Sequence, residues 1–281
     1  MNRTTGTGKY EQVLERCRAM EPVPTAVAHP CEESALTGAI EAGAKRLIVP
    51  ILVGPIAKIR DVAQKAGVEL GNTRLVDAPH SHAAAAKAVE LVRQGQAELL
   101  MKGSLHSDEL LSAVVAKETG LRTGRRISHV FIMDVPTYHK VLVVTDAAIN
   151  IAPALEDKAD ICQNAIDLAI ALGLKKPKVA ILAAVETVNS KMQATLDAAA
   201  LCKMAERGQI TGGVLDGPLA FDNAISKRRR GSKGFNRRWP EIPTSSSYRI
   251  SSRGTCSRSS SVSWPTPTPP VSCSVRACRS S

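Results

Sequence analysis

Short apolar runs alternate with longer segments of helical period through residues 1–226. Eight short apolar runs, several of them rich in β-branched residues, are predicted strands. Seven segments that repeat apolar positions every three to four residues are predicted helices. This alternation predicts an α/β protein with a mainly parallel sheet. The predicted strands are Ala26–His29, Arg46–Val53, Arg74–Asp77, Glu98–Met101, His129–Met133, Lys140–Thr145, Val179–Ala183 and Gly213–Asp216. The predicted helices are Tyr10–Met20, Glu32–Ala42, Ile56–Ala66, Ser81–Gln94, Ser107–Val115, Ala154–Leu172 and Ala194–Arg207.

One pair of strands departs from the alternation. Only Asp134–Lys140 separates the runs Val130–Met133 and Val141–Val144. A crossover helix needs a longer connection, so these runs are predicted to form an antiparallel hairpin. We therefore expect a mixed sheet in the second half of the chain.

The turn-rich, charged stretch Gly120–Arg126 lies between the first strand and helix series and this hairpin. It predicts a first α/β lobe at residues 1–120 and a second at 121–226, with a cleft near the junction. Residues 227–281 differ in composition from both lobes, since they are rich in Ser, Pro and Arg and have no amphipathic period. As written, this tail is predicted to be largely disordered.

The charge of the chain changes abruptly at the tail. From Lys227 onward there are 12 Lys or Arg and one acidic residue, whereas the preceding residues hold 25 basic and 25 acidic side chains. The net charge of +11 therefore belongs to the tail and does not by itself indicate a nucleic-acid or membrane partner.

The N-terminus, MNRTTGTGKYEQ, lacks the continuous apolar stretch of a signal peptide, and no apolar run has the length of a membrane span, which needs about 18 residues. We expect a cytoplasmic protein. The four cysteines of residues 1–226 are far apart in sequence and form no CxxC pair, so no metal site is predicted.

The segment ELLMKGSLHSDELL contains a strand, a turn with Lys102, Gly103 and Ser104, and a helix start. Backbone N–H groups at such a turn, together with the Lys102 charge, can hold a phosphate or pyrophosphate. An ordinary capped strand-to-helix loop has the same appearance. The pattern therefore fits two interpretations, an anion site at Lys102 and Ser104 or an ordinary capped loop.

Three arginines follow in LRTGRRISH, and among them Arg126 is the candidate for binding phosphate oxygens, either of free phosphate or of the coenzyme A (CoA) 3′-phosphate. A solvated basic loop is the alternative. Polar residues also follow later predicted strands. They are expected either to line a ligand cleft or to cap the next helix, and they are Thr145, Asp146, Asp216 and Asp222.

Five ordered motifs together resemble the phosphate acetyl/butyryltransferase family, especially its shorter butyryltransferase-like members. A similar segment forms the acyltransferase half of bifunctional enoyl-CoA hydratase/phosphate acetyltransferases. The resemblance covers nearly all of residues 9–226. The motifs are HPCEESALTGAIEAG, LLMKGSLHSDELLSAVV, TGRRISHVFIMDVPTYHKVLVVTDAAINIAP, PKVAILAAVETVNSKM and TGGVLDGPLAFDNAIS.

The resemblance implies a two-lobed α/β fold related to isocitrate and isopropylmalate dehydrogenases, assembled as a homodimer. It implies that CoA and phosphate are substrates, that no cofactor is permanently bound and that no metal is required. Acetyltransferase members carry an Arg where this chain has Leu111, which favours the butyryltransferase-like branch.

After DNAIS the chain departs from the family pattern. The family continues with an apolar strand, a PDLEAGN-like motif and an active-site Ser-Arg pair with a downstream Asp, whereas this chain reads KRRRGSKGFNRRW. With permitted codons, a frame that begins at the third base of each codon rereads residues 227–251 as AAAGIKGIQSAVAGNPDILVVPDL and residues 252–262 as EPGNMLAKQLG. We interpret the tail as the product of a single-base frame change near Ser226 and Lys227. No catalytic residue is assigned, and the literal chain is expected to have little or no activity.

Three other functions are alternatives to acyl transfer. Loss of the Ser-Arg segment would suit a noncatalytic remnant that still binds CoA or phosphate. Nucleic-acid binding through the basic tail is disfavoured because the frame change accounts for the tail's charge. A β-decarboxylating dehydrogenase could share the fold, but fold alone does not confer function.

Overall fold

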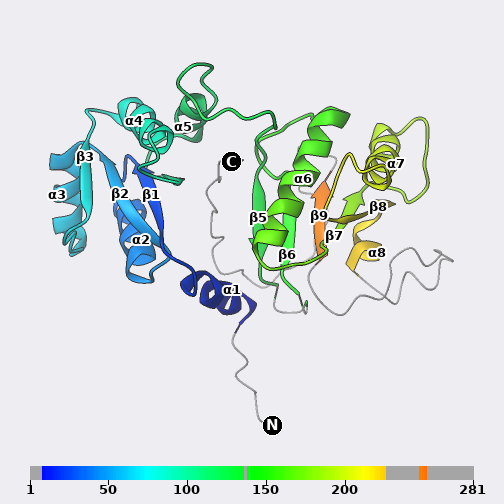
Figure 1. Cartoon of the computed structure of the whole chain (residues 1–281), viewed down its shortest axis with the longest axis horizontal. Helices are drawn as coiled ribbons and strands as arrows, with labels where there is room; N and C mark the ends of the chain where they lie inside the picture. Colours follow the sequence, from blue (N-terminus) through cyan, green and yellow to red (C-terminus); the bar gives the residue numbers. More distant parts are fainter. Residues whose placement is uncertain (1–7, 136–137, 139, 226–246, 252–281) are drawn as a thin grey trace, which may run out of the picture. The chain divides into compact units, whose positions relative to one another are not determined.

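The computed structural model describes residues 8–135, 138, 140–225 and 247–251 (Figure 1). These residues belong to two compact units. We call Glu11–Gly124 the N-terminal unit, and residues 8–10 together with the described residues from Arg125 onward the C-terminal unit. The first helix among the described residues is α1 (Lys9–Arg18).

The N-terminal unit is built on a four-stranded, fully parallel sheet in the order β3-β2-β1-β4. Each strand is followed by a helix, so that all four helices begin at the carboxyl edge of the sheet. The strands are β1 (Val23–Ala28), β2 (Ile48–Gly54), β3 (Arg74–Asp77) and β4 (Leu99–Lys102), and the helices are α2 (Glu33–Ala44), α3 (Ile56–Ala66), α4 (Ser81–Arg93) and α5 (Ser107–Val114).

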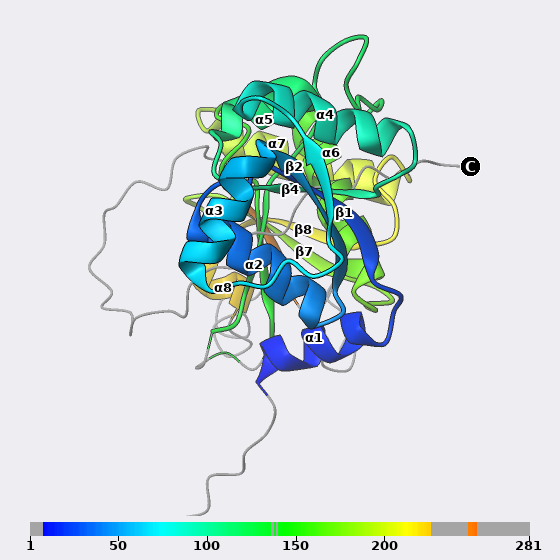
Figure 2. The same ribbon diagram turned by 90° about the vertical axis from the view of Figure 1, so that its left-hand side faces the viewer.

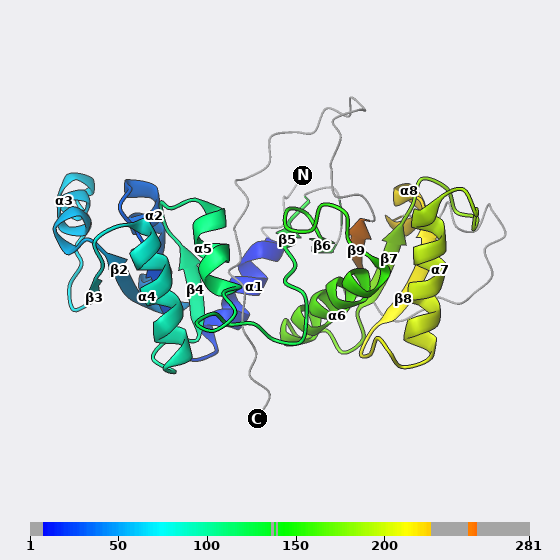
Figure 3. The same ribbon diagram turned by 90° about the horizontal axis from the view of Figure 1, so that it is seen from above.

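Alternate residues of these strands enter two separate cores. Ala26 and Val53 pack with α4 on one face, while Val27 and Leu52 pack with α2 and α3 on the other. The result is three layers, with α2 and α3 side by side on one face and α4 on the opposite face (Figures 2 and 3). A strand buried on both faces explains why β1 and β2 read as continuous apolar runs.

The C-terminal unit is built on a five-stranded mixed sheet in the order β5-β6-β9-β7-β8. Strands β5 and β6 pair antiparallel, which confirms the predicted hairpin, and the other neighbours are parallel. The strands are β5 (Val130–Met133), β6 (Leu142–Thr145), β7 (Lys178–Leu182), β8 (Val214–Leu219) and β9 (Ser247–Ser251), and the helices are α6 (Leu155–Ala171), α7 (Gln193–Glu206) and α8 (Phe221–Ile225).

Helices α6 and α7 cover one face of this sheet, where Ile161, Ile166 and Leu201 pack against Val179 and Ile181 of β7. On the opposite face, Ala224 of α8 packs with Ala180 and Leu219. Within the described ranges, no helix is long and apolar enough to cross a membrane.

The predicted fold class, α/β with a mixed second sheet, is confirmed. Three elements differ from the prediction. Strand β8 does not end at Asp216 but continues to Leu219, and the short helix α8 was not expected. Strand β9 lies inside the tail that the sequence predicts to be disordered, and the remaining tail residues lie outside the described ones.

Candidate functional site

The carboxyl edge of the N-terminal sheet brings four loops to one place. Strands β1, β2, β3 and β4 end there, and α2 to α5 begin there. In two of these first turns, the Ile56 N–H donates to the Asp77 carboxylate and the Ala83 N–H donates to Nδ1 of His80. Because helix N-termini carry partial positive charge, this edge is suited to anionic ligands. Lys102 is the last residue of β4 at this edge, and Ser104 lies in the loop between β4 and α5.

Ser104 ties the β4–α5 loop to the loop after β1. Its hydroxyl donates to the His29 carbonyl oxygen at 2.7 Å and accepts from the Cys31 backbone N–H at 3.1 Å. Its oxygen also lies 3.3 Å from Nδ1 of the His29 imidazole. Ser104 thus fixes the conformation of the residues that precede α2.

The same junction depends on a glycine and on a left-handed residue. A Cβ atom on Gly103 would lie 2.4 Å from the Ala28 carbonyl oxygen and 2.5 Å from that of His29, so only glycine permits this approach. His29 itself has a φ of 54°, in the region that residues other than glycine adopt rarely. The chain therefore holds the His29 loop closely against the β4–α5 loop.

Lys102 turns back over its own loop. Its Nζ donates to the carbonyl oxygens of Leu105 at 2.7 Å and of Gly103 at 3.4 Å. Lys102 and Ser104 therefore stabilise the strand-to-helix loop, as the capped-loop reading expects. Lys102 is exposed at the sheet edge.

The imidazole of His29 is surrounded by charged and titratable groups. Burial lowers its pKa, and the positive charge of Lys58 lowers it further, while Glu109 and Glu32 act in the opposite direction and His80 again lowers it. His29 is therefore neutral at physiological pH. The sequence analysis did not select His29. The feature of the sequence that could have identified His29 as a site residue is its position directly after a parallel strand.

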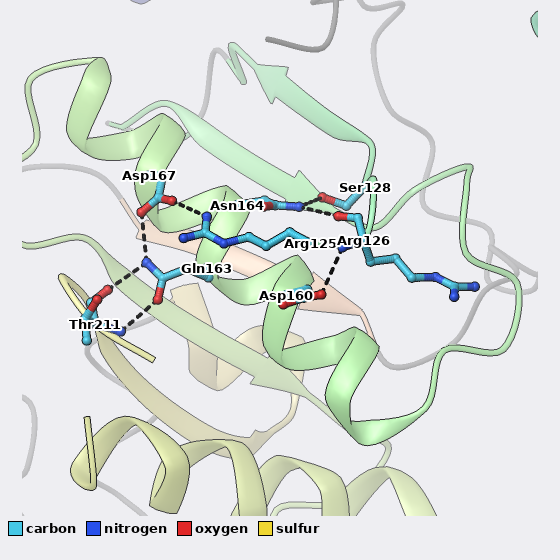
Figure 4. A network of polar contacts seen from close by, with 8 residues as sticks. All are labelled: Arg125, Arg126, Ser128, Asp160, Gln163, Asn164, Asp167 and Thr211. Carbon is cyan, nitrogen blue, oxygen red and sulfur yellow. Dashed lines mark hydrogen bonds and ion pairs between the residues drawn. The ribbon is translucent and has the colours of Figure 1, made fainter. Parts of the chain in front are cut away.

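In the C-terminal unit, α6 holds the arginine loop (residues 125–128) along its polar side (Figure 4). The Asp160 carboxylate accepts from the Arg126 backbone N–H at 2.9 Å, and the Asn164 amide donates to the Arg126 carbonyl at 2.8 Å. Asp167 pairs with the Arg125 guanidinium at 2.5 Å. These acceptors and donors recur at helical spacing, so one face of α6 fixes the backbone of the loop.

Four further hydrogen bonds complete this network. Asn164 also donates to the Ser128 hydroxyl at 3.0 Å. Gln163 bonds Asp167 at 2.8 Å and exchanges two hydrogen bonds with the backbone of Thr211, at 2.8 and 3.1 Å. Figure 4 shows Asp160, Gln163, Asn164 and Asp167 on α6, with Ser128 and Thr211 on neighbouring segments.

The Arg126 guanidinium is oriented by two groups. Its Nε donates to the Asn150 side-chain oxygen at 2.8 Å, and one terminal nitrogen lies 3.3 Å from the Asp157 carboxylate. The side chain remains 53% exposed. Arg126 thus presents an oriented, partly exposed cation, which is the arrangement needed for recognition of phosphate oxygens.

Asp146 organises the loop after β6. Burial by itself would raise the pKa of this carboxyl, but hydrogen bonds from the Ala148, Ile149 and Asn150 backbone N–H groups and from the Asn150 amide hold the pKa below its usual value. Asn150 connects the Asp146 carboxylate to Arg126. Asn150 is a residue that the sequence analysis missed.

Thr145 is fully buried, and its hydroxyl donates to the His129 carbonyl at 2.8 Å. The structure therefore brings Thr145, Asp146 and Arg126 into one hydrogen-bonded region, in which Thr145 and Asp146 support the loops.

Asp216 and Asp222 take other positions. Asp216 lies within β8 opposite Ala180 of β7. The pKa of Cys202 on α7 is raised mainly by burial, and the charge of Asp216 raises it further by a smaller amount. Asp222 lies in the first turn of α8. The prediction that Asp216 follows the end of its strand is wrong, because Gly217 and Pro218 continue β8. The described residues contain no group of three or more His, Cys, Asp or Glu side chains that could hold a metal ion.

Comparisons with known proteins give the family. The family model described as "Phosphate acetyl/butaryl transferase" matches residues 81–241. The phosphate acetyltransferase of Rhizobium meliloti is 63% identical over 228 residues, which cover 81% of this chain and 72% of that protein. The chain belongs to the phosphate acetyl/butyryltransferase family. The predicted family and its transferase class are therefore confirmed.

The phosphate acetyltransferase of Rickettsia prowazekii (strain Madrid E) is 55% identical over 228 residues, covering 81% of this chain and 65% of that protein. A phosphotransacetylase structure from Streptococcus pyogenes matches the fold with a TM-score of 0.68 and 18% identity, over 85% of this chain and 81% of that one. Both sequence relatives are named acetyltransferases, so they give no support to the butyryltransferase-like branch that Leu111 favours.

Proposed function

We propose that this chain is a phosphate acyltransferase that exchanges an acetyl or butyryl group between CoA and inorganic phosphate. The observation that carries the proposal is the 63% identity with the phosphate acetyltransferase of Rhizobium meliloti. Because 228 of the 281 residues are matched, the similarity must reach both units.

In the direction of acyl-CoA formation, the CoA thiol loses its proton and its sulfur attacks the carbonyl carbon of the acyl phosphate. A C–S bond forms, the C–O bond to phosphate breaks, and phosphate leaves with the electron pair. This reaction requires a base, cations for the phosphate and donors for the oxyanion. It requires no redox change.

Several residues of this chain fit the binding part of that chemistry. Arg126 offers guanidinium donors to phosphate oxygens, and Lys102 supplies positive charge at an edge lined by helix N-termini. Ser104, Thr145 and Asp146 position the loops through their hydrogen bonds. Asp216 and Asp222 stay candidates for lining the ligand site, and no residue is given the role of base.

The frame change in the tail provides the sharpest test. We would prepare the chain as printed and a chain whose tail carries the restored reading, then measure release of the CoA thiol from acetyl-CoA and from butyryl-CoA in phosphate. We expect turnover by the restored chain, with acetyl-CoA preferred, and little or none by the printed chain. Absence of turnover in the restored, folded chain would sink the proposal.

The alternative function is a noncatalytic protein that binds CoA or phosphate, and the departure of the tail from the family pattern favours it for the literal chain. Calorimetric titration of CoA into both chains distinguishes the two functions. Binding by both with turnover by one supports an acyltransferase that lost activity through its tail. We also propose a homodimer for the restored chain, and analytical ultracentrifugation tests it directly.

A further inference from the structure

Asn150 lies in the loop after β6 and connects this loop to the arginine loop. The residue is buried, with 8% of its surface exposed. Its amide nitrogen donates to the Asp146 carboxylate and, at 2.9 Å, to the Ile127 carbonyl. Its amide oxygen accepts from Nε of Arg126 at 2.8 Å. One side chain therefore joins the loop after β6 to both the backbone and the guanidinium of the arginine loop.

The partners of Asn150 permit only one orientation of its amide. A carboxylate and a backbone carbonyl can only accept hydrogen bonds, and Nε of an arginine can only donate. The amide nitrogen must therefore face Asp146 and Ile127, and the oxygen must face Arg126. The Asp146 carboxylate is itself fixed by the backbone N–H groups of residues 148–150. Because a rotated amide would lose its bonds to all of these partners, Nε of Arg126 is held at a defined position.

The guanidinium of Arg126 has a neutral partner on Nε and a charged one on a terminal nitrogen. The charged partner is Asp157, at 3.3 Å, whose other carboxylate oxygen accepts from the Ala154 N–H at 2.9 Å. Within the described residues, Asn150 and Asp157 are the only partners of this guanidinium. A phosphate group must therefore bind at the terminal nitrogens, because Nε is already occupied. The amide orients the cation without neutralising it, which a carboxylate at the same place would do.

Other side chains hold the arginine loop by its backbone. Asp160 accepts from the Arg126 backbone N–H, and Asn164 donates to the Arg126 carbonyl. These contacts determine the path of the loop, whereas Asn150 determines where the end of the Arg126 side chain lies. The two roles can therefore be separated by substitution.

We propose that Asn150 is a positioning residue of the phosphate-binding site, which holds Nε of Arg126 through a neutral amide and so leaves the terminal nitrogens for a phosphate group of the substrate. The proposal rests on the proposed function, because that function supplies the phosphate-bearing substrates. Free phosphate and the CoA 3′-phosphate present the same chemistry to the guanidinium. Loss of Asn150 should therefore weaken phosphate binding only while Arg126 is present.

The test is a double-mutant cycle of Asn150→Ala and Arg126→Ala in the full chain, with affinity measured by calorimetric titration. We expect Asn150→Ala alone to weaken binding about tenfold, as for the loss of a hydrogen bond to a charged group. In the Arg126→Ala background, the same change should alter the affinity less than about twofold.

Separate titrations with inorganic phosphate and with adenosine 3′,5′-bisphosphate show which phosphate group Arg126 binds, since the matching ligand shows the coupling. Equal losses in both backgrounds for both ligands would overturn the proposal. Absence of binding of either ligand by the unaltered chain would overturn it as well.

Asn164→Ala is the matched control, because it removes an amide that bonds the Arg126 backbone and not the guanidinium. We expect a clearly smaller loss of phosphate affinity, since Asp160 still holds the same stretch of backbone. A loss as large as that of Asn150→Ala would assign the effect to a disturbed loop and reject the positioning role.

Asn150→Asp keeps the shape of the side chain and stays informative if Asn150→Ala folds poorly. It places a second carboxyl beside Asp146, and two such groups share a proton at low pH. The shared proton restores the donor and the neutrality of the amide. We expect affinity close to that of the wild type at acidic pH and about tenfold weaker binding once both carboxyls are ionised. The wild type at each pH is the reference, because phosphate itself titrates. Wild-type affinity at every pH would contradict the proposal.

Turnover of the restored chain separates this inference from the proposed function. Acyl transfer without coupling between Asn150 and Arg126 would reject the positioning role and leave the proposed function standing. Coupling in phosphate binding without acyl transfer would reject the proposed function and leave the positioning role.

Discussion

Lys158 on α6 and Asp197 on α7 form an ion pair inside the C-terminal unit, with side chains only 9% and 8% exposed. Gln193 donates a further hydrogen bond to the Asp197 carboxylate at 2.8 Å. The pair joins two helices that otherwise meet through apolar residues of the same core. A buried ion pair of this kind is sensitive to the loss of either partner.

We predict that Lys158→Met lowers the free energy of unfolding by roughly 3–5 kcal/mol, because it leaves the Asp197 carboxylate buried without its cation. The double variant Lys158→Met with Asp197→Leu should recover most of that loss. Denaturant unfolding followed by circular dichroism measures both. Equal stability of the single variant and the wild type would show that the pair does not stabilise the helix contact.

Gly103→Ala should destabilise the N-terminal unit. The new Cβ would approach the Ala28 and His29 carbonyl oxygens to within 2.5 Å, so backbone must move. We expect a loss of roughly 1–3 kcal/mol in the free energy of unfolding. Gly124→Ala is the control, since nothing lies within 4 Å of its Cβ position, and its effect should stay within about 0.5 kcal/mol. Comparable effects of the two changes would contradict the close approach.

Asp146→Asn should destabilise the C-terminal unit in a pH-dependent way. Hydrogen bonds hold the Asp146 pKa below its usual value, so its ionised form stabilises the fold. The advantage of the wild type, about 1–3 kcal/mol, should be fully present above the unfolded pKa of about 3.9 and should disappear as the pH falls through the lower folded pKa.

Unfolding curves of wild type and Asp146→Asn at neutral and acidic pH measure this difference. Asp61→Asn is the comparison, because Asp61 forms an exposed pair with Lys65 and should contribute little. A stability difference for Asp146→Asn that does not change with pH would exclude the carboxylate as its source.

Arg126→Lys in the restored chain should weaken the binding of phosphate-bearing substrates. Lysine keeps the charge but cannot reproduce the fixed guanidinium fork or the Nε bond to Asn150. We expect KM to rise about tenfold with a smaller change in kcat, as for lost substrate binding. Arg125→Lys, which alters the pair with Asp167, should change KM less. Equal increases in KM in both variants would show that weaker substrate binding comes from a disturbed arginine loop and not from loss of the Arg126 guanidinium.

Regular elements were well predicted because their apolar periods reflect burial. The strand Arg74–Asp77 and the helix Ile56–Ala66 have the predicted bounds, and the antiparallel hairpin followed from a short connection. Parallel strands also identified the sheet edge that gathers Lys102 and Ser104. Pattern and connection length are local properties, which a single sequence contains.

Contacts between residues far apart in the chain could not be predicted from local periodicity or connection length. In the sequence, Gly217 and Pro218 indicate the end of a strand. In the structure they continue β8, which is an edge strand, where the missing N–H of a proline is tolerated. Gly217 also packs closely, since a Cβ atom there would lie 2.8 Å from that of Ile181. His29 and Ser104 are 75 residues apart, and no sequence period connects them. Asn150 likewise gained its importance only from Asp146 and Arg126.

Strand β9 lies between β6 and β7, although it is the last described segment of the chain. During synthesis, residues 11–124 leave the ribosome with all four strands of their sheet and can fold at once. The second sheet cannot close until its central strand emerges more than 60 residues after β7, and until then the facing edges of β6 and β7 have no strand between them. Nascent chains of this protein are therefore most exposed to chaperones, and to mispairing with one another, in the interval before residue 247 appears.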